Sequence, residues 1–493
     1  MKRERGEFIV DMMRKKTVFG VIIGVRGFFN PELAVGDRKA LYRLLDSLGI
    51  EWVTLEPEAT PSGAIETLAD AEKLAALFRS RQDDIDGVLV VLPNFGDEQA
   101  VAETLKAARL DVPVLVQASN DEVDKVDLAG RRDAFCGKLS VCNNLRQYGI
   151  KFTDTSVHTC DVAGEGFRRD VEEFAAVCRV VRGLRNAKIG MLGVRPAAFQ
   201  TVRFSEKLFQ ASGIKIIPVD MSVIMAEAKQ VDQAGAAYKD KLEAIQAYAN
   251  IEPGTKPEQL SRQVQFSVAV EKFVADNGLD ATVVQCWDAL QNNFGCASCL
   301  TMSMMGNALK PSACEGDAAG AVSMLTLALA TLRPSALLDW NNNYGLEPDI
   351  CVNTHCGNYP ADFFGTRPEV GTLDVLGGTI GRDLCFGAVK GKVMPGDMTF
   401  FRVSTEDAGG YVKAYVGEGE FIDRKFDMAG GIAVCKIDRM RKLLATLCAN
   451  GFEHHVAMVR ARTARAVHEA VVKYLGWKTY WHNQPEEQKV DIL

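Results

Sequence analysis

Five acidic and imidazole side chains of this chain are of the types that hold a divalent metal ion. Glu315 precedes an apolar segment of small residues, Asp339 ends an apolar run, His355 lies in a polar stretch, and His454 and His455 are adjacent. Each also has an ordinary structural role open to it, as a helix cap, a turn residue or a buried imidazole. If the fold brings them together, they form an oxygen and nitrogen ligand set that suits manganese, magnesium or a related ion with open positions.

The cysteines and glycines favour no other chemistry. Many of the 13 cysteines lie inside apolar runs, as reduced core thiols do, and the CxxC formed by Cys296 and Cys299 has no second pair or nearby histidine to complete a zinc site. The chain contains neither GxGxxG nor GxxxxGK[ST]. Nothing therefore supports binding of a nicotinamide cofactor or a nucleoside triphosphate.

Strand and helix patterns alternate in the first half of the chain. Apolar runs predict strands over 17–24, 50–55, 87–92 and 113–116, and amphipathic segments predict helices over 37–48, 64–79 and 98–109. Continuous apolar strands separated by helices predict a parallel sheet that is covered on both faces. Ligand contacts in this architecture lie on loops after the strands, which is where Arg26, Asn94 and Gln117 are expected.

The pattern repeats once and then changes. A second strand, helix and strand are predicted over 188–194, 202–212 and 215–219, whereas from about Phe364 short alternating segments predict an antiparallel sheet or small barrel over 398–403, 411–417, 421–422 and 431–437, closed by a helix over 463–475. The predicted fold is α/β: two Rossmann-like parallel-sheet N-terminal domains, residues 1–184 and 185–352, followed by a β-rich, barrel-like C-terminal domain, residues 353–493.

Composition excludes several classes of protein. The 493 residues are 47% hydrophobic and 25% charged with a formal charge of −7, which is typical of a water-soluble globular chain and disfavours general affinity for nucleic acid or an anionic membrane. The most apolar stretch, 318–332, is too short to span a bilayer. The charged segment 1–16 is followed by no apolar run of the kind a signal peptide needs, so we expect a cytoplasmic protein.

Four short strings together resemble a known family. They are Cys314-Glu315-Gly316-Asp317, Asp339-Trp340 placed 24 positions after Glu315, Thr354-His355-Cys356-Gly357, and Glu453-His454-His455-Val456. This set resembles the L-fucose and L-arabinose isomerase superfamily, and more closely its fucose-isomerase-like branch. The stretch Ile23-Gly24-Val25-Arg26 is similar to the family's first strand and substrate-facing arginine.

The resemblance implies a metal-dependent aldose–ketose isomerase that assembles as a homo-oligomer, a trimer or hexamer, with active sites between subunits. It implies that Glu315, Asp339 and one late histidine hold Mn²⁺. His455 is the preferred histidine and His454 the alternate. His355 is either a fourth ligand, as in the arabinose branch, or a substrate contact.

Isomerising a monosaccharide moves hydrogen between C1 and C2 and a proton between their oxygens. A divalent ion stabilises the negative charge that develops on those oxygens, and two flanking carboxylates can serve as base on one carbon and acid on the other. We assign these catalytic roles to Glu315 and Asp339 without deciding which does which. A hydride shift between the two carbons is the alternative route.

Substrate recognition has several candidates. The indoles of Trp287 and Trp340 follow apolar runs and either face a sugar or pack in the core, and Arg26, Asn94, Gln117 and Asn341 suit hydroxyl recognition. An anionic group on C6, such as a phosphate or sulfonate, requires several arginines to converge.

The arginines available for a C6 anion are Arg26, Arg195 and Arg203. The substrate is therefore expected to be a free or 6-substituted monosaccharide. An epimerase on the same scaffold and a non-catalytic sugar-binding protein are the alternatives, since tandem α/β modules also build sugar clefts.

Overall fold

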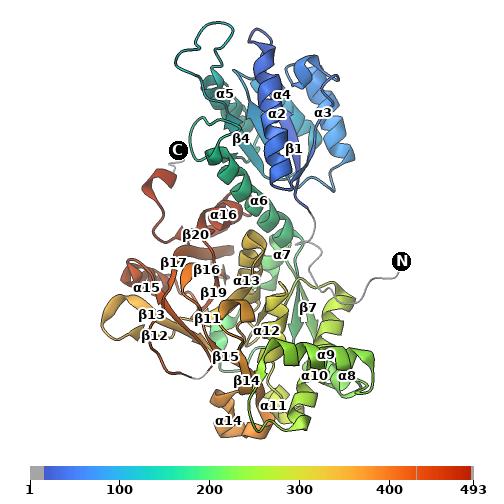
Figure 1. Ribbon diagram of the computed structural model, residues 1–493, viewed down its shortest axis with the longest axis vertical. Coiled ribbons are helices and arrows are strands. Elements are labelled where there is room, and N and C mark those ends of the chain that lie inside the picture. Colours follow the sequence, from blue (N-terminus) through green and yellow to red (C-terminus); the bar gives the residue numbers. More distant parts are fainter. Residues whose placement is uncertain (1–15, 429, 490–493) are drawn as a thin grey trace. The chain divides into compact units, whose positions relative to one another are not determined.

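The computed structural model describes residues 16–428 and 430–489, which form two compact units (Figure 1). Of the described residues, the smaller unit comprises 16–182 and 469–476, and the larger comprises 183–468 and 477–489. Most of the charged N-terminal segment on which the cytoplasmic expectation rested lies outside the described residues. The predicted division at 352/353 falls inside a strand of the larger unit, so the three-domain division stays a prediction.

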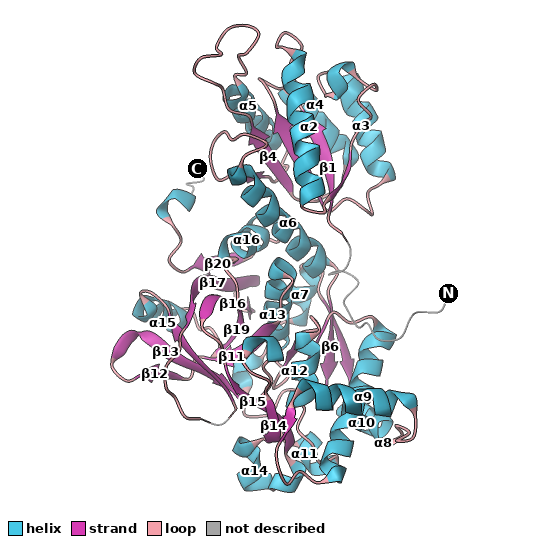
Figure 2. Cartoon of the chain, in the orientation of Figure 1, coloured by secondary structure: helices cyan, strands magenta, loops and turns pink. Residues whose placement is uncertain are grey.

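The smaller unit is a five-stranded parallel sheet in the order β2-β1-β3-β4-β5, flanked by helices (Figure 2). Its strands are β1 (Val18–Ile23), β2 (Glu51–Val53), β3 (Gly87–Leu92), β4 (Val114–Ala118) and β5 (Thr153–Asp154). Its helices are α2 (Pro31–Ser47), α3 (Leu68–Ser80), α4 (Glu98–Ala108), α5 (Ala134–Gln147) and α6 (Glu165–Arg185), the last of which crosses the boundary between the units. Every residue of β1, β3 and β4 is buried, as a sheet covered on both faces requires.

Several predicted boundaries in this unit were wrong. Helix α3 begins at Leu68 rather than at residue 64, and β2 covers only 51–53 of the strand predicted over 50–55. Helix α2 begins at Pro31 rather than at residue 37, because the Asn30 side chain accepts the N–H of Glu32 and Pro31 occupies the first helical turn. Strand β4 extends to Ala118, so Gln117 lies on a strand and not in a loop. Its side chain bonds the Cys160 carbonyl oxygen, which explains how a polar residue continues the strand.

The larger unit begins with a four-stranded parallel sheet in the order β10-β9-β6-β7. Its strands are β6 (Lys188–Leu192), β7 (Lys215–Val219), β9 (Ala281–Val284) and β10 (Ser312–Ala313), and its helices are α7 (Glu206–Ala211), α8 (Met221–Lys229), α9 (Ala236–Tyr248), α10 (Pro257–Asn277), α11 (Ala289–Asn293), α12 (Cys299–Asn307) and α13 (Ala318–Thr331). The chain leaves β6 for β7 on one side and reaches β9 on the other. A reversal of this kind opens a crevice at the carboxyl ends of the strands, where ligands bind in such sheets.

A mixed sheet of 11 strands completes the larger unit. Its main strands are β11 (Ser335–Asp339), β13 (Glu347–His355), β15 (Phe386–Lys392), β16 (Gly396–Glu406), β17 (Tyr411–Phe421), β18 (Gly431–Lys436) and β19 (His455–Val459), and its minor strands are β8 (Asn250–Ile251), β12 (Asn342–Tyr344), β14 (Glu369–Thr372) and β20 (Lys478–Trp481). Helices α14 (Asp374–Ile380), α15 (Met440–Ala449) and α16 (Ala464–Glu469) lie between strands. The predicted fold class, two parallel-sheet α/β regions followed by a β-rich region, is confirmed.

The prediction that the β-rich region begins at about Phe364 was wrong. Apart from the two-residue strand β8, it begins with β11 at Ser335 rather than near Phe364, because β11 pairs antiparallel with β19, a partner far along the chain that no local pattern shows. The separate strand expected over 421–422 does not exist, since β17 runs without a break to Phe421. The closing helix is α16, continued by a π-helical turn over Ala470–Tyr474.

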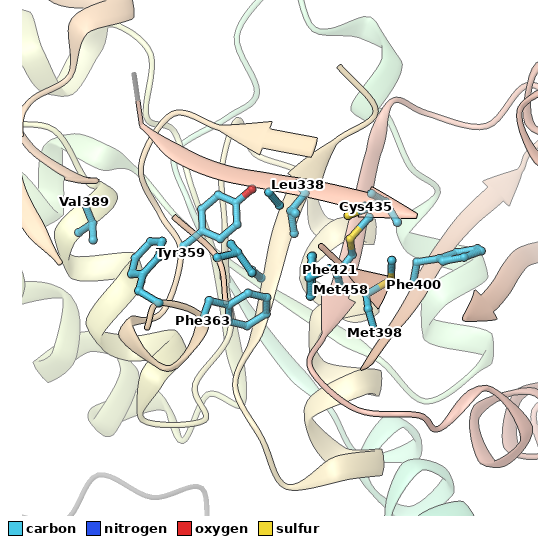
Figure 3. Close-up of a cluster of buried hydrophobic side chains, with 14 of the residues drawn as sticks. Leu338, Tyr359, Phe363, Val389, Met398, Phe400, Phe421, Cys435 and Met458 are labelled. Carbon is cyan, nitrogen blue, oxygen red and sulfur yellow. The ribbon is translucent and has the colours of Figure 1, made fainter. Parts of the chain in front are cut away.

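The core of the larger unit is built from aromatic, methionine and cysteine side chains around the mixed sheet. Figure 3 shows Tyr359 and Phe363 beside Leu338, with Phe400 and Met458 further along the same cluster. Helix α13 is buried from Ala318 to Ala330 and contacts β9, β11, β16 and β19, so the most apolar stretch of the chain is a core helix between the two sheets. No helix in the described part of the chain is both long and apolar enough to cross a membrane.

Candidate active site

Glu315 lies in the turn between β10 and α13, at the carboxyl edge of the four-stranded sheet. Its backbone is left-handed at φ +52°, followed by Gly316 at φ +69°. A Cβ on Gly316 would lie 2.7 Å from the backbone nitrogen of Arg195, so only glycine fits this turn. Strain of this kind in a non-glycine residue persists where the surroundings over-determine it, as at functional sites.

Asp339 and His455 face each other across two antiparallel strands. Asp339 on β11 is the register partner of His455 on β19, which places both side chains on one face of the sheet. The His455 Nε2 atom lies 3.5 Å from Asp339 Oδ1 and 3.4 Å from Glu315 Oε2. The strand pairing and the β10–α13 turn therefore bring the two acids to one imidazole nitrogen.

A buried chain of charges fixes the orientation of His455. Its Nδ1 atom lies 2.8 Å from Asp317 Oδ2, and Asp317 also caps α13 by accepting the N–H of Gly320. Because a carboxylate only accepts, His455 Nδ1 carries the proton and Nε2 presents a lone pair toward Glu315 and Asp339. A histidine held in this way by a carboxylate is a well-oriented metal ligand.

Arg402 holds Asp317 in place. Its guanidinium donates to both Asp317 oxygens and, through Nε at 3.2 Å, to Glu453, whose other oxygen accepts from the Ser404 hydroxyl at 2.6 Å. Burial raises the pKa of Asp317, but Arg402 and His455 outweigh that effect and lower it well below its usual range. Asp317 is thus a fixed negative charge at neutral pH.

His355, the last residue of β13, lies near the same two acids as His455, but its ring is in a different tautomer. Its Nε2 atom is 3.5 Å from Glu315 Oε2 and 4.0 Å from Asp339 Oδ1. The backbone N–H of Cys356 donates to His355 Nδ1 at 2.9 Å, so the ring proton of the neutral imidazole sits on Nε2. This geometry favours His355 as a hydrogen-bond donor over a fourth metal ligand.

The residues present fit a divalent cation. Glu315 Oε2 and Asp339 Oδ1 are buried and have no hydrogen-bond partner among the described residues. The distances of 3.4–3.5 Å from these oxygens to His455 Nε2 suit ligand atoms of one ion, which lie roughly 3–4 Å apart when each bond is about 2.1 Å. The possible ligand atoms form two groups, each within 4.8 Å, that share His455: Glu315 with His355, and Asp339 with His454. The nearby guanidinium of Arg402 already serves Asp317 and Glu453, so it does not balance the charge of Glu315 and Asp339.

The ionisation of Glu315 agrees with a cation site. Burial acts to raise the pKa of Glu315, but the electrostatic effect of the nearby His355 and His455 imidazoles outweighs it and lowers that pKa. The side chain is therefore a carboxylate at neutral pH, the form that binds a metal ion.

An aromatic row borders the site. The side chain of His454, the partner of His455 in the adjacent pair, is 41% exposed, and its Nε2 lies 3.8 Å from Asp339 Oδ1. Its ring lies 6.3 Å from that of Phe199, which meets Trp287 edge to face at 5.4 Å. These partly exposed rings can contact the C–H face of a sugar.

Trp340 and Asn341 follow Asp339 directly, yet both are engaged by the fold. The Trp340 ring meets Phe400 edge to face at 5.8 Å, and its N–H donates to the Tyr415 hydroxyl. Asn341 Oδ1 accepts from the Thr354 hydroxyl at 2.8 Å. These contacts support a packing role, and substrate binding by either residue stays a prediction.

Arg26, Asn94 and Gln117 belong to the smaller unit. The backbone N–H of Arg26 donates to Asn94 Oδ1 at 3.1 Å, and the Arg26 side chain donates to the Phe95 carbonyl oxygen and pairs with Glu98. The structure therefore brings Arg26 and Asn94 together after β1 and β3. Gln117 is fully buried at the end of β4, and its Oε1 has no hydrogen-bond partner among the described residues.

Several residues around the site were missed in the sequence. Asp317 and Glu453 stood inside strings already singled out, but only the fold shows that they serve His455 through Arg402. Arg402 did give a signal, because a charged residue inside the apolar segment 398–403 must be paired when the strand is buried. Phe199 gave none, since it lies in the loop after β6 that only the fold carries to His454.

Comparisons with known proteins agree with this geometry. Family models described as "Fucose/sulfoquinovose isomerase, N-terminal domain" and "L-fucose isomerase, C-terminal domain" match residues 20–185 and 353–482. A sulfoquinovose isomerase of Alkalicoccus urumqiensis is 23% identical over 416 residues, covering 82% of this chain and 88% of that protein. Sulfoquinovose isomerases of Priestia aryabhattai and Priestia megaterium are each 26% identical over 464 residues, covering 91% of this chain and 95% of each relative.

Proposed function

The chain belongs to the fucose isomerase-like superfamily, and from that premise we propose that it is an aldose–ketose isomerase that uses a divalent metal ion, Mn²⁺, held by Glu315, Asp339 and His455. One observation carries the metal part of the proposal. Two buried carboxylate oxygens, which find no hydrogen-bond partner in the described part of the chain, converge on a histidine nitrogen that presents a lone pair, and the neighbouring arginine is already paired.

The residues of the site divide the work of isomerisation. When bound, the metal ion acts as a Lewis acid toward the oxygens on C1 and C2 of the sugar. Glu315 and Asp339 approach from different elements, so one carboxylate can take a proton from one carbon while the other returns a proton to its neighbour. His355 donates its Nε2 proton to an oxygen in the site, and the Asp317–Arg402–Glu453 chain keeps His455 oriented.

We propose that the preferred substrate is a 6-sulfo sugar. Sulfoquinovose isomerases align over most of this chain, and sulfoquinovose carries a sulfonate on C6. The loop after β6 holds the partly exposed Arg195 and the exposed Arg203, and Arg195 lies against Gly316, next to Glu315. Guanidinium groups bind such an anion through paired hydrogen bonds.

A substrate panel tests the proposal. The panel contains fucose, arabinose, rhamnose, mannose and glucose together with 6-phosphate and 6-sulfonate forms, and ketose is followed by NMR with Mn²⁺ and with a chelator. We expect ketose only when metal is present, fastest from a 6-sulfonated aldohexose. A changed configuration at one carbon without ketose would instead identify an epimerase, and tight binding without conversion would identify a sugar-binding protein.

A further inference from the structure

The two oxygens of Glu315 have different surroundings. Oε2 faces the histidines, whereas Oε1 lies 3.7 Å from the sulfur of Cys286, which follows β9. The neighbouring Cys314 sulfur lies 3.9 Å from the thioether sulfur of Met302 on α12. All of these side chains are buried, and the proposed isomerisation uses none of the sulfurs.

These spacings are close to those of a tetrahedral metal site. The sulfurs of Cys286 and Cys314 and an oxygen of Glu315 all lie within 4.8 Å of one another. Ligand atoms at the corners of a tetrahedral zinc site with sulfur bonds of about 2.3 Å lie roughly 3.8 Å apart. The two printed distances, 3.7 Å from Cys286 to Glu315 and 3.9 Å from Cys314 to Met302, are close to that spacing.

The ligand types select a different metal from the isomerase site. Thiolate and thioether sulfur prefer thiophilic ions such as Zn²⁺ and Cd²⁺, whereas carboxylate and imidazole groups suit Mn²⁺. Without an ion, the same sulfurs make weak hydrogen bonds: the Cys286 thiol donates to Glu315 Oε1 and accepts the Glu315 N–H at 3.4 Å.

We propose that Cys286, Cys314 and Glu315, with Met302 as a weak fourth ligand, form a second, thiophilic metal site that takes Zn²⁺ or Cd²⁺. Binding replaces the two thiol protons, which pass to the buffer, with two metal–sulfur bonds and one metal–oxygen bond.

Glu315 is common to both sites, so occupation of the sulfur cluster restrains the carboxylate that the isomerase needs. The ion is therefore an inhibitor that acts beside Mn²⁺ rather than in its place. This consequence for turnover rests on the proposed function, but binding at the cluster does not.

Cadmium titration of the metal-free, reduced full chain tests binding without any sugar. We expect the ultraviolet thiolate-to-cadmium charge-transfer band in the wild type, and at least about 100-fold weaker binding in a Cys286→Ser, Cys314→Ser double variant. The matched control is Cys351→Ser, Cys435→Ser, which alters another buried cysteine pair, opposite each other on β13 and β18. A band that survives in the first variant and disappears in the control overturns the proposal.

A measurement on the wild type alone guards against variants that fail to fold. The ¹¹³Cd NMR shift reports the atoms bound to cadmium, and we expect the shift of an ion with two thiolates. A shift typical of oxygen and nitrogen ligands only would overturn the proposal.

Inhibition is scored separately, as the loss of Mn²⁺-dependent turnover when cadmium is added. We expect a loss of at least about 10-fold in the wild type and little in the Cys286→Ser, Cys314→Ser variant. Cadmium binding by a chain that turns over no sugar supports the second site and contradicts the proposed function. Turnover that cadmium inhibits equally in both proteins contradicts the second site alone.

Discussion

His455 and His355 reach the same pair of acids with opposite hydrogen-bonding character. The Asp317 carboxylate accepts a hydrogen bond from Nδ1–H of His455, and the Cys356 N–H donates to the Nδ1 lone pair of His355. One ring therefore offers a lone pair and the other a proton to the space between Glu315 and Asp339. Two residues of one type thus serve different roles because their backbone and carboxylate partners differ.

This difference predicts a split between two matched variants. His455→Asn should weaken Mn²⁺ binding by at least about 100-fold, because it removes a ligand, whereas His355→Asn should weaken it by less than about 10-fold and mainly lower kcat. Titration of free Mn²⁺ by electron paramagnetic resonance measures the first effect, and initial rates measure the second. Equal losses of metal affinity in both variants would make His355 a ligand after all.

At the scale of elements, the turn between β10 and α13 positions the acid. Gly316→Ala should cost more than the usual left-handed penalty of about 1 kcal/mol, because its Cβ would lie 2.7 Å from a backbone atom of Arg195. Gly345→Ala is the matched control, since Gly345 is also left-handed at φ +59° but faces open space. We expect Gly316→Ala to lower turnover and the urea midpoint and Gly345→Ala to change only the midpoint, slightly; similar behaviour of the two would contradict this role of the turn.

Asp317 joins α13, β16 and β19 through one carboxylate. Asp317→Asn keeps a side chain that can cap α13 but removes one of the two carboxylates that pair with Arg402, which should cost about 3–5 kcal/mol of stability for a buried pair. The control is Asp220→Asn, the same change at the exposed cap of α8.

The difference in unfolding free energy between wild type and Asp317→Asn should depend on pH, because the pKa of Asp317 is lowered in the folded protein. Arg402 and His455 lower the pKa of Asp317 below its ordinary value of 3.8, so its contribution is fully present above that value and is lost as the pH falls toward the lower folded-state pKa. Unfolding free energies of wild type and Asp317→Asn should therefore differ most near neutral pH and converge in acid. A difference that grew on acidification would be inconsistent with a charged Asp317.

Local patterns predicted the elements better than their partners. The sequence predicted β1, β3, β6 and the small-residue helix α13, because the apolar residues of each segment alone indicate its burial and its periodicity. The pairing of Asp339 with His455 was not, because the register between β11 and β19 depends on segments far apart in the chain. For the same reason the sequence did not predict that Asp317, Glu453 and Arg402 form one network of buried ion pairs.

At the scale of the whole molecule, apolar side chains remain exposed on the smaller unit. Phe28, Val123 and Leu128 are 75%, 95% and 86% exposed on the loops after β1 and β4, and Asn30 of one loop donates to the Ala129 carbonyl oxygen of the other. Exposed apolar groups gathered on neighbouring loops are typical of an interaction surface.

The resemblance to the isomerase family implies a homo-oligomer, a trimer or hexamer, and we expect its interfaces to cover these loops. A Val123→Asp, Leu128→Asp variant should shift the mass measured by light scattering toward the monomer, whereas the control Leu346→Asp, at another fully exposed apolar residue, should not. A monomeric wild type would contradict the expected assembly.

The most direct test of the central claim is the conversion of sulfoquinovose in deuterated water with Mn²⁺. The wild type is compared with Glu315→Gln and with the control Glu271→Gln. Glu271 lies on α10, where its carboxylate pairs with Lys241 on α9. The account predicts ketose carrying deuterium at C1 with the wild type and the control, and turnover lower by about 10²–10⁴ with Glu315→Gln while the fold is retained. Ketose without deuterium would favour the hydride shift. No ketose at all, or equal rates from all three proteins, would contradict an isomerase built around Glu315.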